Sequence, residues 1–177
     1  MTLLDSPKLV VERKISQPLE ALKLVVRAPR LLRAGAVLAL DDRETVLRFD
    51  RPFGVTLPPF GHADTSWSAP VSARTPRGHA VEHFELELNR WDGLSTELLV
   101  RPRATRPDRW GSGHLRRYFG VAHATADVMT SFLEHHALEL SLHEVAPRGE
   151  VPSSRPSRAT RGRAPEVKVA LACSSIG

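Results

Sequence analysis

Apolar and polar positions alternate along the first 140 residues in a way that predicts strands and two helices. Residues 8–15 are rich in β-branched side chains and predict a strand. Residues 18–27 follow with apolar positions at helical spacing and predict a short helix. Ser16 is a suitable cap for this helix, and Pro29 ends it. The chain therefore starts with a strand that leads into a short amphipathic helix.

Short apolar or alternating segments follow this helix and are separated by turn residues. They predict strands over 36–40, 45–49, a segment around Trp67, 80–89 and 95–101. Residues 50–63 hold three prolines and two glycines and predict a loop. The clearest pair is 80–89 with 95–101, because Asp92-Gly93 between them is typical of a hairpin turn. These segments together predict an antiparallel sheet.

The longest periodic segment lies over residues 114–140. Its apolar residues recur at i, i+3, i+4 and i+7, which predicts one continuous helix with an apolar stripe. Ser112 is placed to cap it. At 1.5 Å per residue the helix would be about 35–40 Å long, enough to cross a whole sheet.

Composition changes after residue 145. Residues 146–177 are rich in Pro, Ser, Arg and Gly, and such a segment buries too little apolar surface to offset the entropy of ordering. We therefore expect one domain over 1–145 and a basic, disordered tail over 146–177. The tail carries four of the five net positive charges, so the domain is nearly neutral and lacks the basic face of a specific nucleic-acid-binding domain. Its arginines suit a weak, salt-sensitive contact with a polyanion.

The compartment and the redox state are also constrained by the sequence. No apolar run approaches the roughly 18 residues of a membrane-spanning helix, and the first residues lack the pattern of a signal peptide. We therefore expect a cytoplasmic protein without a transmembrane segment. Cys173 is the single cysteine, which excludes an intramolecular disulfide and a cysteine-based zinc site.

The order of elements resembles that of the SRPBCC superfamily, the START-like, helix-grip proteins that include polyketide cyclases. The resemblance spans residues 8–140 and is carried by VVERKISQPLEALKLVVRAPRLL, FELELNRWDGLSTELLVRP and RRYFGVAHATADVMTSFLE. It implies an α+β fold in which a curved antiparallel sheet wraps around a long C-terminal helix, with a short helix after the first strand.

The resemblance also implies that a small hydrophobic molecule or a lipid binds in a cavity between sheet and helix. The ligand-binding residues would then be Trp67, Phe84, Leu86, Tyr118, Phe119, Ala122 and Met129. Ala122 and Ala126 are small where a filled core favours bulk, which favours a space. A cavity and a filled core nevertheless share one hydrophobic pattern, so both interpretations stay open.

Two other functions stay open beside hydrophobic ligand binding. A cyclase- or dehydratase-type enzyme on the same fold would need titratable groups inside the cavity, and Glu82, His114 and Tyr118 are the candidates. An interaction protein would use its basic tail on an acidic partner. The sequence leaves open whether any reaction is catalysed, because it contains no nucleophile elbow and no Walker or dinucleotide glycine pattern. We therefore assign no catalytic residue and no cofactor.

Two groups of histidines are candidate metal ligands, and neither leads us to assign a metal. His79 and His83 share a strand face with Glu85 and Glu87, but a solvated face explains this pattern. His135-His136 are adjacent on a helix, so their side chains point about 100° apart and do not bind one ion together. A helix C-terminus also favours positive charge, which explains them.

Gly111-Ser112-Gly113 precedes the long helix and is the remaining polar candidate. Its backbone N–H groups would suit an anion, and Arg109, Arg116 and Arg117 lie close in sequence. A helix cap with surface arginines explains the same residues.

Overall fold

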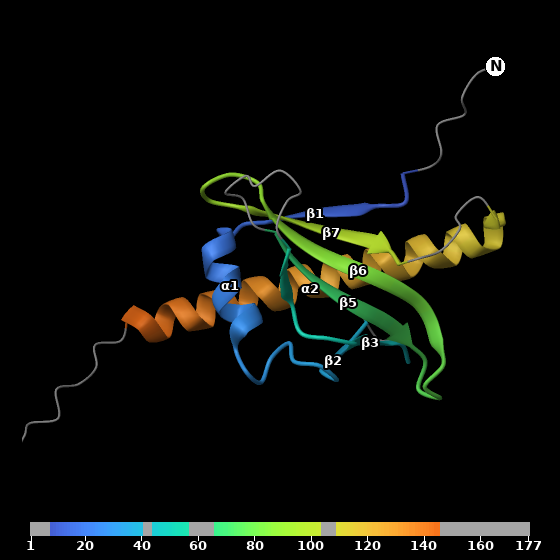
Figure 1. The fold of residues 1–177 in the computed structure, drawn as a ribbon, viewed down its shortest axis with the longest axis horizontal. Coiled ribbons are helices and arrows are strands. Elements are labelled where there is room, and N and C mark those ends of the chain that lie inside the picture. The colour runs from blue at the N-terminus through green and yellow to red at the C-terminus, as the bar shows by residue number, and fades with distance from the viewer. Residues whose placement is uncertain (1–7, 41–43, 57–65, 104–108, 146–177) are drawn as a thin grey trace, which may run out of the picture. The chain divides into compact units, whose positions relative to one another are not determined.

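The computed structural model of the protein describes residues 8–40, 44–56, 66–103 and 109–145 (Figure 1). The elements in chain order are β1 (Val11–Ile15), α1 (Leu19–Arg27), β2 (Val37–Ala39), β3 (Val46–Phe49), β4 (Gly54–Thr56), β5 (Ser66–Arg74), β6 (Ala80–Arg90), β7 (Thr96–Pro102) and α2 (Ser112–Val145). The predicted tail over 146–177, with Cys173, lies outside the described residues, and so does part of the predicted loop over 50–63.

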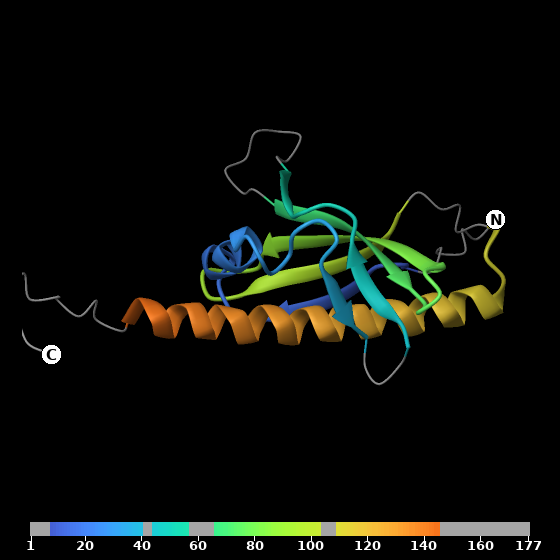
Figure 2. The ribbon, with the colours of Figure 1, turned by 90° about the horizontal axis from the view of Figure 1, so that it is seen from below.

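The seven strands form one antiparallel, curled sheet (Figures 1 and 2). Its strand order is β1-β7-β6-β5-β3-β2, and β4 pairs with β5 beyond the end of β3. The edge strand β1 thus pairs with β7, the last strand of the chain. A long helix, α2, follows β7 and lies along this curled sheet (Figure 2). The α+β helix-grip fold predicted from the sequence is therefore confirmed, including the short helix after the first strand.

Strand β4 (Gly54–Thr56) lies within residues 50–63, which the sequence predicts to be mostly loop. β3 and β4 lie along the same edge of β5, where β3 pairs with Val71–Arg74 and β4 pairs with Ser66–Ser68. Between them the backbone N–H of Asp50 donates to the carbonyl of Pro70 at 3.0 Å. Three residues between prolines are enough to bond to a free strand edge, and single-sequence patterning does not detect so short a strand.

Alternation along β6 determines which side of the sheet is buried. Register aligns Leu88 with Trp67 on β5 and with Leu98 on β7, and it aligns Leu86 with Ala69 and Val100. These side chains are all buried and form one apolar face. The alternating residues of β6 face the other, more polar side, as expected for an antiparallel sheet with one covered face.

Helix α2 covers the apolar face. Its buried stripe consists of Tyr118, Ala122, Thr125, Ala126, Met129, Leu133 and Ala137. The helix packs against β1, β7 and β6 and against α1. It has 34 residues, so it is about 50 Å long and extends beyond both predicted ends. Neither helix of the described residues combines the length and the hydropathy needed to cross a membrane.

Helix α1 begins differently from the prediction. Pro18 is its N-cap residue and makes no side-chain cap bond. Ser16 lies too far upstream to cap the first turn, and its backbone N–H instead donates to Glu134 of α2 at 3.0 Å. The start of α1 is thereby tied to α2 rather than capped by a serine.

Candidate functional site

The seven predicted ligand-binding residues come together between the apolar sheet face and α2. Six of them are buried and belong to one hydrophobic cluster, namely Trp67, Phe84, Leu86, Tyr118, Ala122 and Met129. Phe119 is partly buried and packs against that cluster. Its ring stands edge-on to that of Tyr118, with the ring centroids 5.2 Å apart. The alternation of strands and the stripe on α2 explain this convergence, while a ligand-binding role for these residues stays a prediction.

Among the described residues, four buried side-chain polar atoms have no hydrogen-bond partner. Oγ of Ser95 and Nε2 of His114 are two of them, and the other two lie in this interior. They are Nε1 of Trp67 and Oγ1 of Thr125, and both side chains are buried. Trp67 faces inward from β5, and Thr125 faces the sheet from the buried stripe of α2. An unsatisfied buried donor or acceptor costs about 1–3 kcal/mol, so each of these atoms favours a bound group that meets it.

Thr125 was missed by the sequence argument. It lies in the middle of the apolar stripe of α2, three residues after Ala122 and four before Met129. The sequence does mark this residue, because a threonine among the apolar positions of the helix places a hydroxyl in the core, where it needs a hydrogen-bond partner. Its significance depends on the surrounding atoms, which only the tertiary structure supplies.

A group of ionisable and aromatic side chains lies at the start of α2. We call Glu82, Trp110, His114, Arg117 and Tyr118 the Glu82 cluster. Glu82 shares the inward face of β6 with Phe84, and its side chain is 7% exposed. Nε of Arg117 donates to Oε1 of Glu82 at 3.2 Å. Nε2 of His114 lies 3.7 Å from the same oxygen. The positive charge of Arg117, on α2, thus balances the negative charge of the buried Glu82 carboxylate.

The aromatic residues of the Glu82 cluster pack against one another. The ring of Trp110 lies 4.4 Å from that of His114 and 5.0 Å from that of Tyr118, measured between centroids. Tyr118 also contacts Phe84 at 5.7 Å. Glu82 is buried while Arg117 is 55% exposed, so this charged pair lies at the margin of the apolar interior.

Tyr118 is committed to a structural hydrogen bond. Its hydroxyl donates to the backbone carbonyl of Leu9, ahead of β1. Burial raises the pKa of Tyr118 to about 12, and the nearby Glu82 carboxylate adds to this effect. The phenol therefore stays protonated at neutral pH and does not serve as a base. Of the three titratable candidates, Glu82 and His114 are therefore the candidates for a base.

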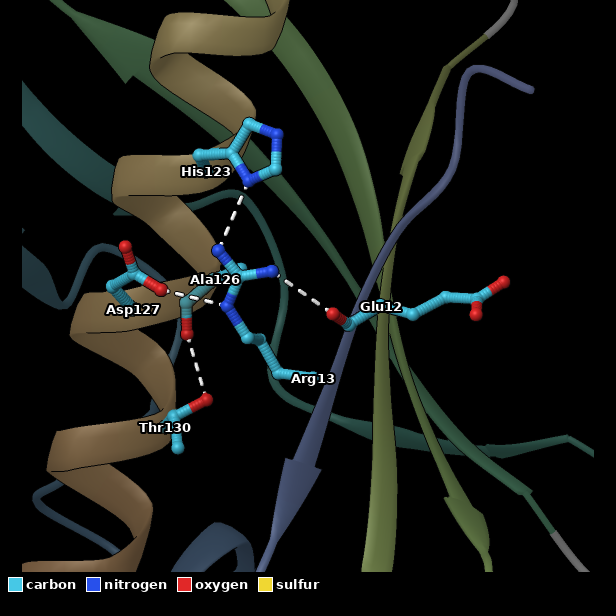
Figure 3. Close-up of polar contacts among 6 residues, drawn as sticks. All are labelled: Glu12, Arg13, His123, Ala126, Asp127 and Thr130. Carbon is cyan, nitrogen blue, oxygen red and sulfur yellow. Dashed lines mark hydrogen bonds and ion pairs between the residues drawn. The ribbon is translucent and has the colours of Figure 1, made fainter.

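A second polar group joins the edge strand β1 to α2 (Figure 3). Nε of Arg13 donates to Oδ1 of Asp127 at 2.7 Å, and Nη2 donates to Nδ1 of His123 at 3.0 Å. Nη1 donates to the carbonyl of Glu12 at 3.0 Å. All three groups of the guanidinium are thus used, and Arg13 holds the helix against the strand rather than offering a free cation.

The other candidates lie on the solvent side. Glu87 and Glu85 pair with arginines of the β7 region, Glu87 with Arg101 at 2.9 Å and Glu85 with Arg103 at 3.8 Å. Within the described ranges, neither carboxylate groups with His79 or His83 at metal-ligand distance. These ion pairs agree with a solvated strand face.

The loop before α2 does not gather its arginines. Ser112 is the first residue of α2, and the carbonyl of Gly111 accepts from the N–H of Leu115 at 3.1 Å. Arg117 turns to Glu82, whereas Arg109 and Arg116 are exposed. This arrangement agrees with the interpretation of a helix start with surface arginines.

An open surface pocket of about 410 Å³ lies apart from the interior. Its lining consists of Ala34, Gly35, Arg48, Phe49, Asp50 and Arg74. Asp50 accepts a hydrogen bond from Ser72 at 3.1 Å and pairs with Arg103 at 3.5 Å. Its charged and open lining does not suit an apolar ligand.

Comparison with known proteins adds little to this picture. No protein-family model matches the chain. No curated protein matches it either. Among solved structures, it is similar to the crystal structure of the Zhui aromatase/cyclase from Streptomyces sp. R1128. The identity is 15%, the match covers 75% of this chain and 94% of that chain, and the TM-score is 0.32. A likeness at this level carries no argument about function, so the helix-grip assignment rests on the strand order and on the packing of α2.

Proposed function

We propose that this chain is an SRPBCC-like protein whose domain, residues 1–145, binds a small hydrophobic molecule or lipid between the sheet and α2. The ligand would also carry a hydrogen-bonding group. The proposal rests on one observation above all: Nε1 of Trp67 and Oγ1 of Thr125, two of the four buried polar side-chain atoms without a hydrogen-bond partner among the described residues, both lie in this interior. Indole N–H only donates, while a hydroxyl both donates and accepts. An apolar molecule with an oxygen acceptor suits both groups.

The small side chains of this region support the same proposal. Ala69 and Ala73 on β5 and Ala122 and Ala126 on α2 are all buried. Small residues on facing layers leave volume that larger side chains would fill in a dense core. Together with the partnerless polar atoms, they favour an apolar site with a few polar anchors, which is the usual composition of small-molecule pockets.

Native mass spectrometry of the purified full chain tests this proposal directly. We expect a co-purified small molecule that is released on denaturation. Thr125→Val should weaken retention of that molecule because it removes the hydroxyl at nearly constant shape, and Trp67→Phe should weaken it because it removes the indole N–H together with part of the ring system. The matched controls are Thr130→Val on the same helix and Trp91→Phe at the exposed hairpin, which should retain it.

A filled core would give the opposite result. No molecule would co-purify, and Thr125→Val would raise the unfolding free energy because it removes an unsatisfied hydroxyl at constant volume. Stabilisation by Thr125→Val with no bound molecule would therefore refute the proposal.

A cyclase- or dehydratase-type enzyme is the second candidate. The observation that favours it is the buried carboxylate of Glu82, beside His114 and Arg117 at the margin of the interior. A buried carboxylate beside an imidazole is a suitable pair for general acid–base catalysis. The test is to incubate the full chain with the co-purified molecule and follow its mass. Conversion that is lost in Glu82→Gln supports an enzyme, and recovery of the unchanged molecule supports binding alone.

The third possibility, a basic tail that binds an acidic partner, concerns residues outside the described ranges and stays a prediction. Comparison of the full chain with a variant ending at residue 145, using anionic vesicles and nucleic acid, checks it. Equal binding by both forms would exclude a role for the tail.

A further inference from the structure

Two histidines and one glutamate converge near the end of α2. Nε2 of His135 lies 3.1 Å from Oε1 of Glu139. Nδ1 of His136 lies 2.7 Å from Oε2 of the same carboxylate. One ligand atom from each of the three residues falls within 4.8 Å of the others. In the described part of the chain no lysine or arginine pairs with Glu139, so the two imidazoles are its partners there.

This arrangement corrects the sequence argument against His135-His136. Adjacent helix positions do point about 100° apart. Glu139, however, lies four residues after one histidine and three after the other, so it is a neighbour of both on the helix surface. The ring of His136 also packs edge-on against Phe132, with centroids 4.4 Å apart. The two rings are brought to a centroid distance of 5.1 Å, close enough to serve one ion.

We propose that His135, His136 and Glu139 form a binding site for a divalent transition metal such as Zn²⁺ or Cu²⁺. Two imidazole nitrogens and one carboxylate oxygen are a usual donor set for these ions. Metal–ligand bonds of about 2.0–2.2 Å place the donors some 3–3.5 Å apart, so donors already within 4.8 Å need only small side-chain rotations. Exposure of the site leaves the remaining coordination positions to water.

This site is independent of the interior proposed above. Side chains of His135 and Glu139 are 67% and 49% exposed, so an ion reaches them directly from solvent. A bound ion would cross-link one turn of α2, from residue 135 to residue 139. Metal binding would therefore hold the end of the helix without touching the ligand-binding residues.

Calorimetric titration of the chelator-treated, untagged full chain with Zn²⁺, and then with Cu²⁺, tests the proposal. We expect one equivalent to bind at neutral pH. Loss of a residue that merely hydrogen-bonds a metal ligand already weakens metal sites by about 10–100-fold, so a His135→Ala/His136→Ala variant, which loses two ligands, should bind at least about tenfold more weakly. Glu139→Gln should weaken binding in the same direction. The matched control is His79→Ala/His83→Ala on the sheet, which should bind like the parent.

Two further readouts decide the location. Paramagnetic Cu²⁺ should broaden backbone NMR signals around residues 132–143 first. Acidification should release the ion, because imidazole binds a metal only when it is deprotonated. The proposal is overturned if no saturable binding occurs. It is also overturned if the His135→Ala/His136→Ala variant binds as tightly as the parent, or if broadening centres on His79 and His83. Circular dichroism of each metal-free variant checks that α2 is intact.

Discussion

The two ends of α2 carry similar ionisable side chains in opposite surroundings. Near its start, Arg117 and His114 approach Glu82, whose side chain is 7% exposed. Near its end, His135 and His136 approach Glu139, whose side chain is 49% exposed. Both groups pair one carboxylate with two cationic or imidazole side chains, yet only the first carboxylate is buried.

The side of the helix on which each carboxylate pairs explains the difference, because Glu139 lies on the solvent side of α2 while Ala137 nearby is still buried. Helix length adds to it. The longest strand, β6, has 11 residues and spans about 36 Å, whereas α2 has 34 residues and spans about 50 Å. The helix is therefore longer than the sheet, and the last turns of the helix extend past the sheet (Figure 2). A carboxylate under the sheet must keep its partners, because desolvated charge is costly. A carboxylate on the solvent side of the helix, such as that of Glu139, exchanges partners at little cost and is free to take a metal ion.

The largest expected contrast between the two ends is in packing. Tyr118→Ala should lower the free energy of unfolding by about 3–5 kcal/mol, because it empties space among buried aromatic rings. Leu142→Ala at the projecting end should change it by less than about 0.5 kcal/mol, since that side chain is 73% exposed. Urea unfolding followed by circular dichroism measures both. Equal losses would show that the end of α2 is covered.

Alkaline titration sharpens the contrast at the buried end. Tyr118 is the single tyrosine of the chain, so tyrosinate absorbance reports it alone. The folded protein should titrate with a midpoint of about 12, against 10.0 for the ordinary side chain. Since the pKa is raised in the folded state, this contribution to stability is present below the unfolded pKa and is lost as pH rises through the folded one. A midpoint near 10.0 in a chain still folded would contradict the burial of the phenol.

Removal of the cation from the Glu82 cluster should have an intermediate effect. Arg117→Met leaves the buried carboxylate without its hydrogen-bonded arginine and should destabilise the fold by about 1–2 kcal/mol. The value is modest because the Arg117 side chain is itself 55% exposed. Arg116→Met, one residue earlier and exposed, is the control and should be near neutral. Thermal unfolding at neutral pH would detect the difference, and matching shifts for both variants would argue against a specific pair.

The smallest effect is expected at Glu139. The hydrogen bond from His136, with the charges of His135 and His136, holds the pKa of this carboxyl below its usual range. Its contribution to stability is therefore present above the ordinary glutamate pKa and is lost as pH falls through the lowered one. Metal-free Glu139→Gln should melt slightly below the parent at about pH 6 and together with it at about pH 3. A larger difference in melting temperature at about pH 3 than at about pH 6 would contradict the lowered pKa of Glu139.

Local patterning determined much of this fold. The alternation of residues 80–89 predicted β6, Asp92-Gly93 predicted the turn to β7, and the stripe over 114–140 predicted α2. Each of these signals lies within one element, because a strand and a helix repeat their side chains at fixed periods along the chain. The convergence of Trp67, Phe84 and Tyr118 followed from the same periods once the element order suggested a sheet around a helix.

Other features depend on contacts between residues far apart in sequence. β4 forms because an edge of β5 is free beside it. The direction in which Arg117 points depends on its hydrogen bond to Glu82, 35 residues earlier. The partnerless hydroxyl of Thr125 has meaning only once the atoms around it are known.

The sequence by itself determined the element types, their order and the apolar faces, since these follow from short-range periodicity. Only the tertiary structure decided which charges are enclosed, which polar atoms lack partners and which end of α2 projects. The reason is physical, because burial and hydrogen-bond satisfaction are properties of surroundings that segments distant along the chain create.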